Sequence, residues 1–333
     1  MNLYSYKQAP IRVFGVPHVE QTGELRRLPD ELLEQLPLIK ERKLGLRTPG
    51  ARIAFRTNSK NIHIKMTVIP AFDIAMSVWA NSAAYVYVGD RATMRYAGHV
   101  APKSYEQAEF EGEVRKSGEV EDVTVYLPRN VHVDDVTIGL EDGAVLQTPT
   151  PYRYESPIVF YGSSITEGGC ATLPTNAYTA IVSRHLDADH VNLGFSGSAQ
   201  GELCLADFIN TLDMSVFVLD YDNNAPTPDH LRATHEPFFL RVRECHPTLP
   251  IVLITRPQVN PSKDADERRE IIRATYENAL ARGDRNVYFI DGGKLFGERD
   301  RQFCTVDGVH PNDLGFARMA DVVEPVIREI LEK

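Results

Sequence analysis

The chain has 333 residues, of which 43% are hydrophobic and 25% charged, and its formal net charge is −10. This length suits two domains, and the composition is that of globular proteins with sizeable cores. The acidic balance argues against nucleic acid or an anionic membrane as the main partner, because both require clustered lysine and arginine. The doublets Arg26–Arg27 and Arg268–Arg269 are the longest runs of arginine, and we interpret both as solvated surface.

The N-terminus, MNLYSYKQAP, lacks the positive stretch and apolar core of a secretory signal. The sequence also has no apolar run of about 18 residues that would span a bilayer. We therefore expect a cytoplasmic protein. The four cysteines form no C-x-x-C pair, so the sequence indicates no zinc or redox motif, and we expect buried free thiols. They are Cys170, Cys204, Cys245 and Cys304.

Residues 1–147 contain short segments in which apolar and polar residues alternate with the period of two that half-buried strands have. The clearest are residues 53–57, 62–66, 84–88 and 123–127. Turn residues such as Gly89-Asp90 separate them, which is typical of a β-sandwich or jelly roll. We expect one helix, over residues 29–36, within this part of the chain.

Three prolines between residues 148 and 157 predict an extended linker. In residues 158–333, nearly continuous apolar strands alternate with helices, which implies a parallel sheet covered on both faces and hence an α/β domain. The expected strands are 158–161, 216–219, 251–254 and 287–290, and the expected helices are 176–187, 229–245, 264–282 and 312–332.

A serine follows the first of these strands directly. Residues 158–168 read Ile-Val-Phe-Tyr-Gly-Ser-Ser-Ile-Thr-Glu-Gly, so Gly162 ends the strand and Ser164 stands just beyond it. Ligands of open α/β sheets bind outside the carboxyl ends of the strands, where this hydroxyl can face a substrate. We expect Ser163 to be a turn residue.

A serine needs a base to become a nucleophile, and the sequence offers one near its far end. Residues 307–313 read Asp-Gly-Val-His-Pro-Asn-Asp. His310 can remove the serine proton and return it to the leaving group, and Asp307 can fix the imidazole tautomer from a tight turn. Asn312 or Asp313 is suited to cap the final helix.

The negative charge of a tetrahedral intermediate requires hydrogen-bond donors. Residues 191–198 follow a short expected strand, and their loop offers the backbone N–H of Gly197. The loop after residues 216–219 offers an asparagine side chain, from Asn223 or Asn224.

These segments together resemble the sequence blocks of SGNH/GDSL hydrolases. Gly162-Ser-Ser-Ile-Thr166 resembles the first block, residues 192–197 the second, residues 220–224 the third, and Asp307-x-x-His310 the fifth. Four blocks in order form a specific pattern. The resemblance implies a three-layer, flavodoxin-like parallel-sheet domain and an enzyme that needs no cofactor or metal.

The same resemblance assigns roles to individual residues. Ser164 is the expected nucleophile, activated by His310 and Asp307, and its N–H forms the oxyanion hole with Gly197 and Asn224. Ser163 stands where the family usually has aspartate, which leaves the chemistry intact. The third block departs more, because Asp222 replaces a glycine and a one-residue shift would select Asn223.

The other polar residues have plainer expected roles. Arg256 follows a strand, and it and Asn223 are further candidates for substrate contact. We expect Asp220 and Asp222 to form a hydrogen-bonded loop rather than a cation site, and we place His185 and His190 around a helix end. Trp79 is either a sandwich core residue or a sugar platform, and core is the better interpretation.

We expect hydrolysis of a small acyl ester, such as an acetyl ester, on a carbohydrate or polyol. A β-sandwich ahead of the hydrolase domain also resembles the arrangement in some carbohydrate esterases. The alternatives are acyl transfer or lipid or thioester hydrolysis on the same residues, and a carbohydrate-binding protein with a silent site. The sequence leaves the acyl group, the alcohol and the oligomeric state open.

Overall fold

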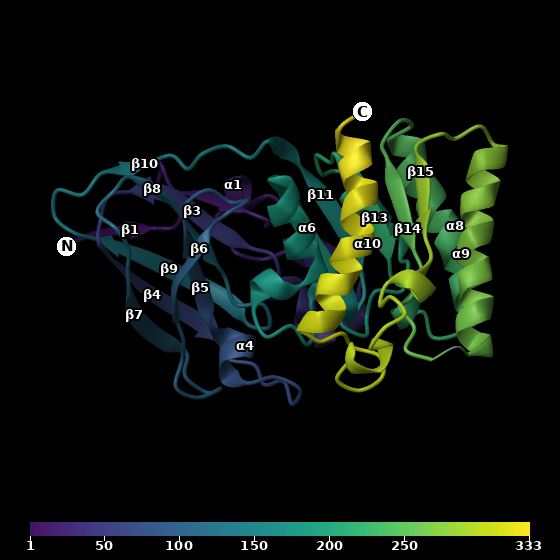
Figure 1. Cartoon of the computed structure of the whole chain (residues 1–333), viewed down its shortest axis with the longest axis horizontal. Helices are drawn as coiled ribbons and strands as arrows, with labels where there is room; N and C mark the ends of the chain where they lie inside the picture. The colour runs from purple at the N-terminus through teal and green to yellow at the C-terminus, as the bar shows by residue number, and fades with distance from the viewer. Residues whose placement is uncertain (261) are drawn as a thin grey trace.

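The computed structural model describes residues 1–260 and 262–333, which form two lobes side by side (Figure 1). The N-terminal lobe is a sandwich of two antiparallel sheets. The first sheet contains, in order, β1 (Asn2–Ser5), β9 (His132–Leu140), β4 (Asn61–Ile69) and β7 (Glu109–Arg115). The second contains β10 (Leu146–Gln147), β3 (Arg52–Thr57), β8 (Glu121–Tyr126), β5 (Ala84–Val88) and β6 (Arg95–Val100), with β2 (Arg12–Phe14) paired to β3.

Alternation along the strands builds the core of the sandwich. In β4, for example, Ile62, Ile64, Met66 and Val68 are all buried, and the residues between them are at least partly exposed. They pack against apolar residues of the facing sheet, such as Val125 of β8. The period of two in the sequence therefore predicted the inward faces correctly.

The second lobe contains a five-stranded parallel sheet, which confirms the expected α/β fold. Its strands, in order, are β12 (Ala188–Gly194), β11 (Tyr154–Gly162), β13 (Val216–Asp220), β14 (Ile251–Ile254) and β15 (Val287–Ile290). Helices cover both faces: α6 (Tyr178–Leu186) and α10 (Asp313–Leu331) on one, and α7 (Leu203–Ile209), α8 (Pro228–Cys245) and α9 (Lys263–Ala281) on the other. No helix of the described residues is long and apolar enough to cross a membrane.

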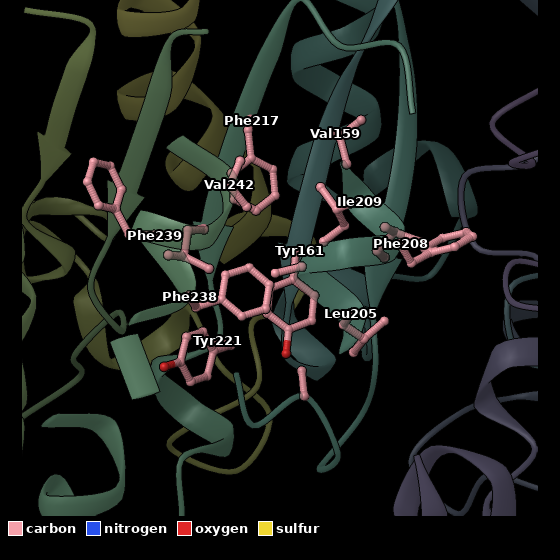
Figure 2. Packing of buried hydrophobic residues seen from close by; sticks show 14 of the residues in the cluster. Val159, Tyr161, Leu205, Phe208, Ile209, Phe217, Tyr221, Phe238, Phe239 and Val242 are labelled. Atoms are coloured by element: carbon pink, nitrogen blue, oxygen red, sulfur yellow. The ribbon is translucent and has the colours of Figure 1, made fainter. Parts of the chain in front are cut away.

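Successive residues of β11 point to opposite faces of this sheet. Phe160 packs with α6 and α10, whereas Tyr161 packs with α7 and α8. The ring of Tyr161 stacks on that of Phe238, with ring centroids 4.8 Å apart. Figure 2 shows these two rings together among the buried residues of this cluster. Because residues 158–161 of β11 are buried on both faces of the sheet, this part of the strand is an unbroken apolar run.

The N-terminal half also contributes to the core of the second lobe. The expected helix over residues 29–36 is instead two short helices, α2 (Asp30–Leu33) and α3 (Pro37–Glu41), followed by the 3₁₀ turn η1 (Leu44–Leu46). Pro37 starts α3, because proline suits the first turn of a helix. Leu33 and Leu36 pack in the same cluster as Tyr161. This segment therefore covers the parallel sheet rather than the sandwich.

Several local expectations were wrong. Residues 191–194 belong to β12 rather than to a loop, so His190 is buried within a strand and does not lie at a helix end. β11 begins at Tyr154, inside the expected linker. Trp79, in the short helix α4 (Val78–Ser82), is 53% exposed and is not core. Of the four cysteines, only Cys304 is buried.

Candidate active site

Three loops meet at the carboxyl ends of β12, β11 and β13. Gly162 is paired in register with Gly194 on one side and Asp220 on the other. A Cβ atom at Gly162 would lie 2.4 Å from the carbonyl oxygen of Asp220, and one at Gly194 would lie 2.2 Å from the amide nitrogen of Glu167. Only glycine allows the loops to approach so closely.

Ser164 begins α5 (Ser164–Glu167), the short helix that follows β11. The side chain of Ser163 caps this helix by accepting a hydrogen bond from the amide of Ile165 at 3.2 Å, so Ser163 is the turn residue that we expected. Ser164 is buried, with only 6% of its surface exposed.

His310 and Asp307 lie on a turn just before α10. Nδ1 of His310 is 2.7 Å from Oδ2 of Asp307, and Nε2 is 2.9 Å from Oγ of Ser164. Because a carboxylate only accepts hydrogen bonds, Nδ1 carries the proton, and Nε2 is left to accept from the serine hydroxyl. The structure thus joins three residues that the sequence separates by 146 positions at most.

The Asp307 carboxylate is held in its charged form. Its other oxygen, Oδ1, accepts hydrogen bonds from the amides of Val309 and His310 at 2.9 and 2.8 Å. Partial burial alone would raise the pKa of Asp307, but these bonds and the His310 side chain outweigh it and lower the pKa. Asp307 therefore remains ionised beside the His310 imidazole.

Two contacts fix the start of α10 beside Ser164. The side chain of Asn312 caps α10 by accepting from the amide of Gly315 at 3.1 Å. Asp313 accepts from the amide of Thr172, in the loop that follows α5, at 2.9 Å. These contacts bring the His310 turn against the serine loop.

The two expected oxyanion donors lie on the neighbouring loops. Gly197 has φ of +65°, a conformation that favours glycine. Asn224, in the 3₁₀ turn η3 (Asp222–Asn224), donates from Nδ2 to the carbonyl oxygen of Phe195 at 2.8 Å. An amide group has two N–H donors, so one remains for a ligand. Nδ2 of Asn223 is buried and has no partner among the described residues.

Asp220 and Asp222 form the hydrogen-bonded loop that we expected. Oδ2 of Asp220 accepts from Thr166 and Tyr178 at 2.9 and 2.8 Å. Burial raises the pKa of Asp220 to about 7, although both hydrogen bonds lower it. Asp222 is ion-paired with Arg268.

Arg256, the other candidate for substrate contact, lies in an ion-pair network. Its Nε donates to Asp222 at 3.2 Å and its Nη1 to Asp264 at 3.2 Å. Only 20% of its side chain is exposed. Its guanidinium is thus engaged with Asp222 of the η3 turn and with Asp264 of α9.

Sequence reasoning missed Arg27 and Glu167 and was wrong about the basic doublets. The side chain of Arg27 is completely buried and that of Glu167 is 2% exposed, and the two form an ion pair at 3.5 Å. Arg268 is also buried. No periodic pattern marks an isolated buried arginine, so this pair could not be found from sequence patterns.

Two protein-family profiles match the chain. The profile of the GDSL-like lipase/acylhydrolase family matches residues 155–328, and that of the N-terminus of SGNH-hydrolase-type esterases matches residues 1–146. No curated protein sequence matches the chain.

Several solved structures share the whole fold. A GDSL-like lipase from Bacteroides ovatus ATCC 8483 is similar, with a TM-score of 0.89 and 27% identity over 99% of this chain and 98% of that one. A salicylyl-acyltransferase from a tetracycline biosynthetic pathway gives 0.82 and 21%, over 99% and 97%. An acetyl xylan esterase from the rumen bacterium Butyrivibrio proteoclasticus gives 0.62 and 12%, with both chains fully covered.

The parallel sheet, with its sandwich and its loops at the carboxyl ends of the strands, defines an SGNH-type hydrolase fold. The chain belongs to the GDSL-like lipase/acylhydrolase family, whose profile matches more than half of it. It is therefore a carboxylic ester hydrolase.

Proposed function

We propose that this enzyme hydrolyses small acyl esters, such as acetyl esters of a carbohydrate or polyol, through an acyl-enzyme on Ser164. The observation that carries the proposal is the continuous chain of contacts from Ser164 Oγ through His310 to Asp307, at 2.9 and 2.7 Å. An intact relay of this kind is what acyl transfer to a serine requires.

The contacts suggest the order of events. Nε2 of His310 takes the hydroxyl proton as Ser164 Oγ attacks the ester carbonyl, and Asp307 stabilises the imidazolium. The N–H groups of Ser164 and Gly197 and Nδ2 of Asn224 receive the oxyanion. His310 then protonates the leaving alcohol, and water releases the acyl group by the same steps.

The crowding at Ser164 supports a small acyl group. A Cβ atom at Gly169 would lie 3.6 Å from Cβ of Ser164 and 3.7 Å from Cδ2 of His310. The chain at Gly169 thus passes close to both reacting side chains and limits the space on that side of them. The fold that the chain shares with proteins described as carbohydrate esterases, one of them an acetyl xylan esterase, is the support for a carbohydrate or polyol as the alcohol.

A direct test is turnover of p-nitrophenyl acetate by the wild type and by Ser164→Ala. We expect the alanine variant to lose on the order of 10³-fold or more in kcat. A fluorophosphonate should add one adduct to the intact wild-type mass, on Ser164. Equal turnover by the two proteins, or an adduct elsewhere, would refute the assignment of the nucleophile.

Acyl transfer or lipid hydrolysis on the same residues is the second candidate. Val306 and Val309 flank Asp307 and are 55% and 48% exposed, so an apolar surface adjoins the site. A series of p-nitrophenyl esters from acetyl to decanoyl separates the candidates. A fall in kcat/KM beyond butyryl supports the first, and a rise supports the second. Sugar binding without turnover of any ester would instead indicate a silent site.

A further inference from the structure

Glu167 holds the loop that carries Gly197. It lies three residues after Ser164, and its Oε2 accepts a hydrogen bond from the amide of Ser196 at 3.0 Å. We name residues 196–198 the oxyanion loop. The Glu167 side chain is only 2% exposed, and a buried carboxylate requires hydrogen-bond or ion-pair partners. The serine loop, residues 163–173, does not supply all of them.

Arg27, from the N-terminal half, is the main partner. Its guanidinium lies 3.5 Å from Oε1 of Glu167 and donates to the carbonyl oxygens of Asn192 and Gly194 at 3.1 and 2.5 Å. Both carbonyls belong to the end of β12, just before the oxyanion loop. Arg27 therefore holds the end of β12 directly, and it holds the oxyanion loop through Glu167.

The same guanidinium also reaches the second oxyanion donor. It lies 4.5 Å from the centroid of the Phe195 ring. The carbonyl oxygen of Phe195 holds the side chain of Asn224 at 2.8 Å. Arg27 thus contacts Phe195, whose carbonyl oxygen holds Asn224, and the carbonyl oxygen of Gly194, just before the oxyanion loop.

A second buried arginine from the N-terminal half holds the loop that follows α5. Arg129 is 1% exposed, and Glu167 is the carboxylate that most strongly opposes the lowering of its pKa by burial. Its Nη2 donates to the carbonyl oxygen of Ala171 at 3.0 Å, in the loop after α5. Two buried arginines of the N-terminal half therefore contact the chain after Ser164, Arg27 at Glu167 and Arg129 at Ala171.

We infer that Arg27, acting through Glu167, is a positioning residue for the oxyanion hole, so that the N-terminal half completes the catalytic site. The inference rests on the proposed function. Donors of an oxyanion hole act on the transition state, and a displacement of about 1 Å can cost on the order of 10²-fold in rate. Loss of this support should therefore lower kcat and leave KM almost unchanged.

The test uses three variants with p-nitrophenyl acetate. Arg27→Met and Glu167→Ala should each lower kcat by about 10- to 100-fold, with KM within about threefold of the wild type. Glu167→Gln should fall between Glu167→Ala and the wild type in kcat, because its carboxamide oxygen can still accept from the Ser196 amide while its NH₂ group would face the Arg27 guanidinium. If Arg27→Met does not fold, the two Glu167 variants decide the question.

Arg52→Met is the matched control. Arg52 is also a buried arginine of the N-terminal half, but it pairs with Asp189 at the opposite end of β12. This variant should lower the melting temperature and keep the wild-type kcat. The inference is overturned if Arg27→Met and Glu167→Ala lose no more kcat than Arg52→Met, or if Glu167→Gln falls as far as Glu167→Ala.

Amide hydrogen exchange separates this inference from the proposed function. A peptide covering residues 194–200 should exchange faster in Arg27→Met and Glu167→Ala than in the wild type or Arg52→Met, whether or not the enzyme turns over the ester. Wild-type exchange in both variants refutes the positioning role. An inactive wild type with this exchange pattern refutes the proposed function instead.

Discussion

Nδ2 of Asn224 donates a hydrogen bond of 2.8 Å to the carbonyl oxygen of Phe195. This bond ties the loop after β13 to the loop after β12, one residue before the oxyanion loop. It also fixes the orientation of the Asn224 side-chain amide. The direction of the second N–H is therefore set by a bond to backbone, which is more rigid than a side chain. No such contact holds the side-chain nitrogen of Asn223 among the described residues.

The two asparagines should therefore differ when they are mutated. We expect Asn224→Ala to lower kcat for p-nitrophenyl acetate by roughly 10²–10³-fold, because it removes an oxyanion donor. Asn223→Ala is the matched control and should stay within about tenfold of the wild type. The reverse order of the two effects would assign the oxyanion role to Asn223.

Asp307→Asn should impair the base without unfolding the protein. The new carboxamide oxygen can still accept from the amides of Val309 and His310, but its NH₂ group would face Nδ1 of His310 and favour the wrong tautomer. We expect kcat to fall by about 10²–10⁴-fold with little change in melting temperature. Glu298→Gln, at an exposed position, controls for loss of charge, and equal effects of the two changes would contradict the role of Asp307.

Arg256→Gln should act on stability rather than on substrate affinity. It would leave the fully buried Asp222 with one cation, Arg268, and we expect a loss of about 1–3 kcal/mol in the free energy of unfolding. Arg232→Gln, which breaks exposed pairs with Asp229 and Glu267, should cost less than about 1 kcal/mol. Urea unfolding measures both, and a large rise in KM with unchanged stability would favour substrate contact instead.

Asp220 should give the protein a distinctive dependence of stability on pH. Its pKa is 3.8 in the reference state and about 7 in the fold, because burial opposes ionisation. Between these values the folded protein keeps a proton that the unfolded chain has lost, so this group's contribution to stability falls as the pH rises to about 7.

Asp220→Asn removes this titration. Relative to the wild type, the variant should gain roughly 2–3 kcal/mol in the free energy of unfolding when the pH is raised from 5 to 8. Urea unfolding at both pH values measures the gain, with Asp229→Asn, at an exposed position, as the control. A difference between wild type and variant that does not change with pH would show that Asp220 does not titrate in this range.

The sequence by itself determined the fold class and the composition of the candidate site. Periods of two and unbroken apolar strands are local consequences of which faces a strand buries, so they could be read without a structure. The sequence blocks around Ser164, Gly197 and His310 are also short contiguous stretches, so they could be recognised without a structure. Residues 191–194 were misjudged because a short strand cannot be told from its adjoining loop by pattern alone.

Only the tertiary structure decided which distant groups meet. Which of Asn223 and Asn224 bonds to the loop after β12 depends on how the loop after β13 turns. Arg256 donates to the buried Asp222, a contact that the spacing of residues in the sequence does not predict. From the sequence we interpreted Arg27 as a surface residue. It is instead buried against Glu167, because helices α2 and α3 pack on the parallel sheet. The physical reason is that burial and ion pairing are properties of the packed chain, whereas the sequence encodes only the local preferences that precede packing.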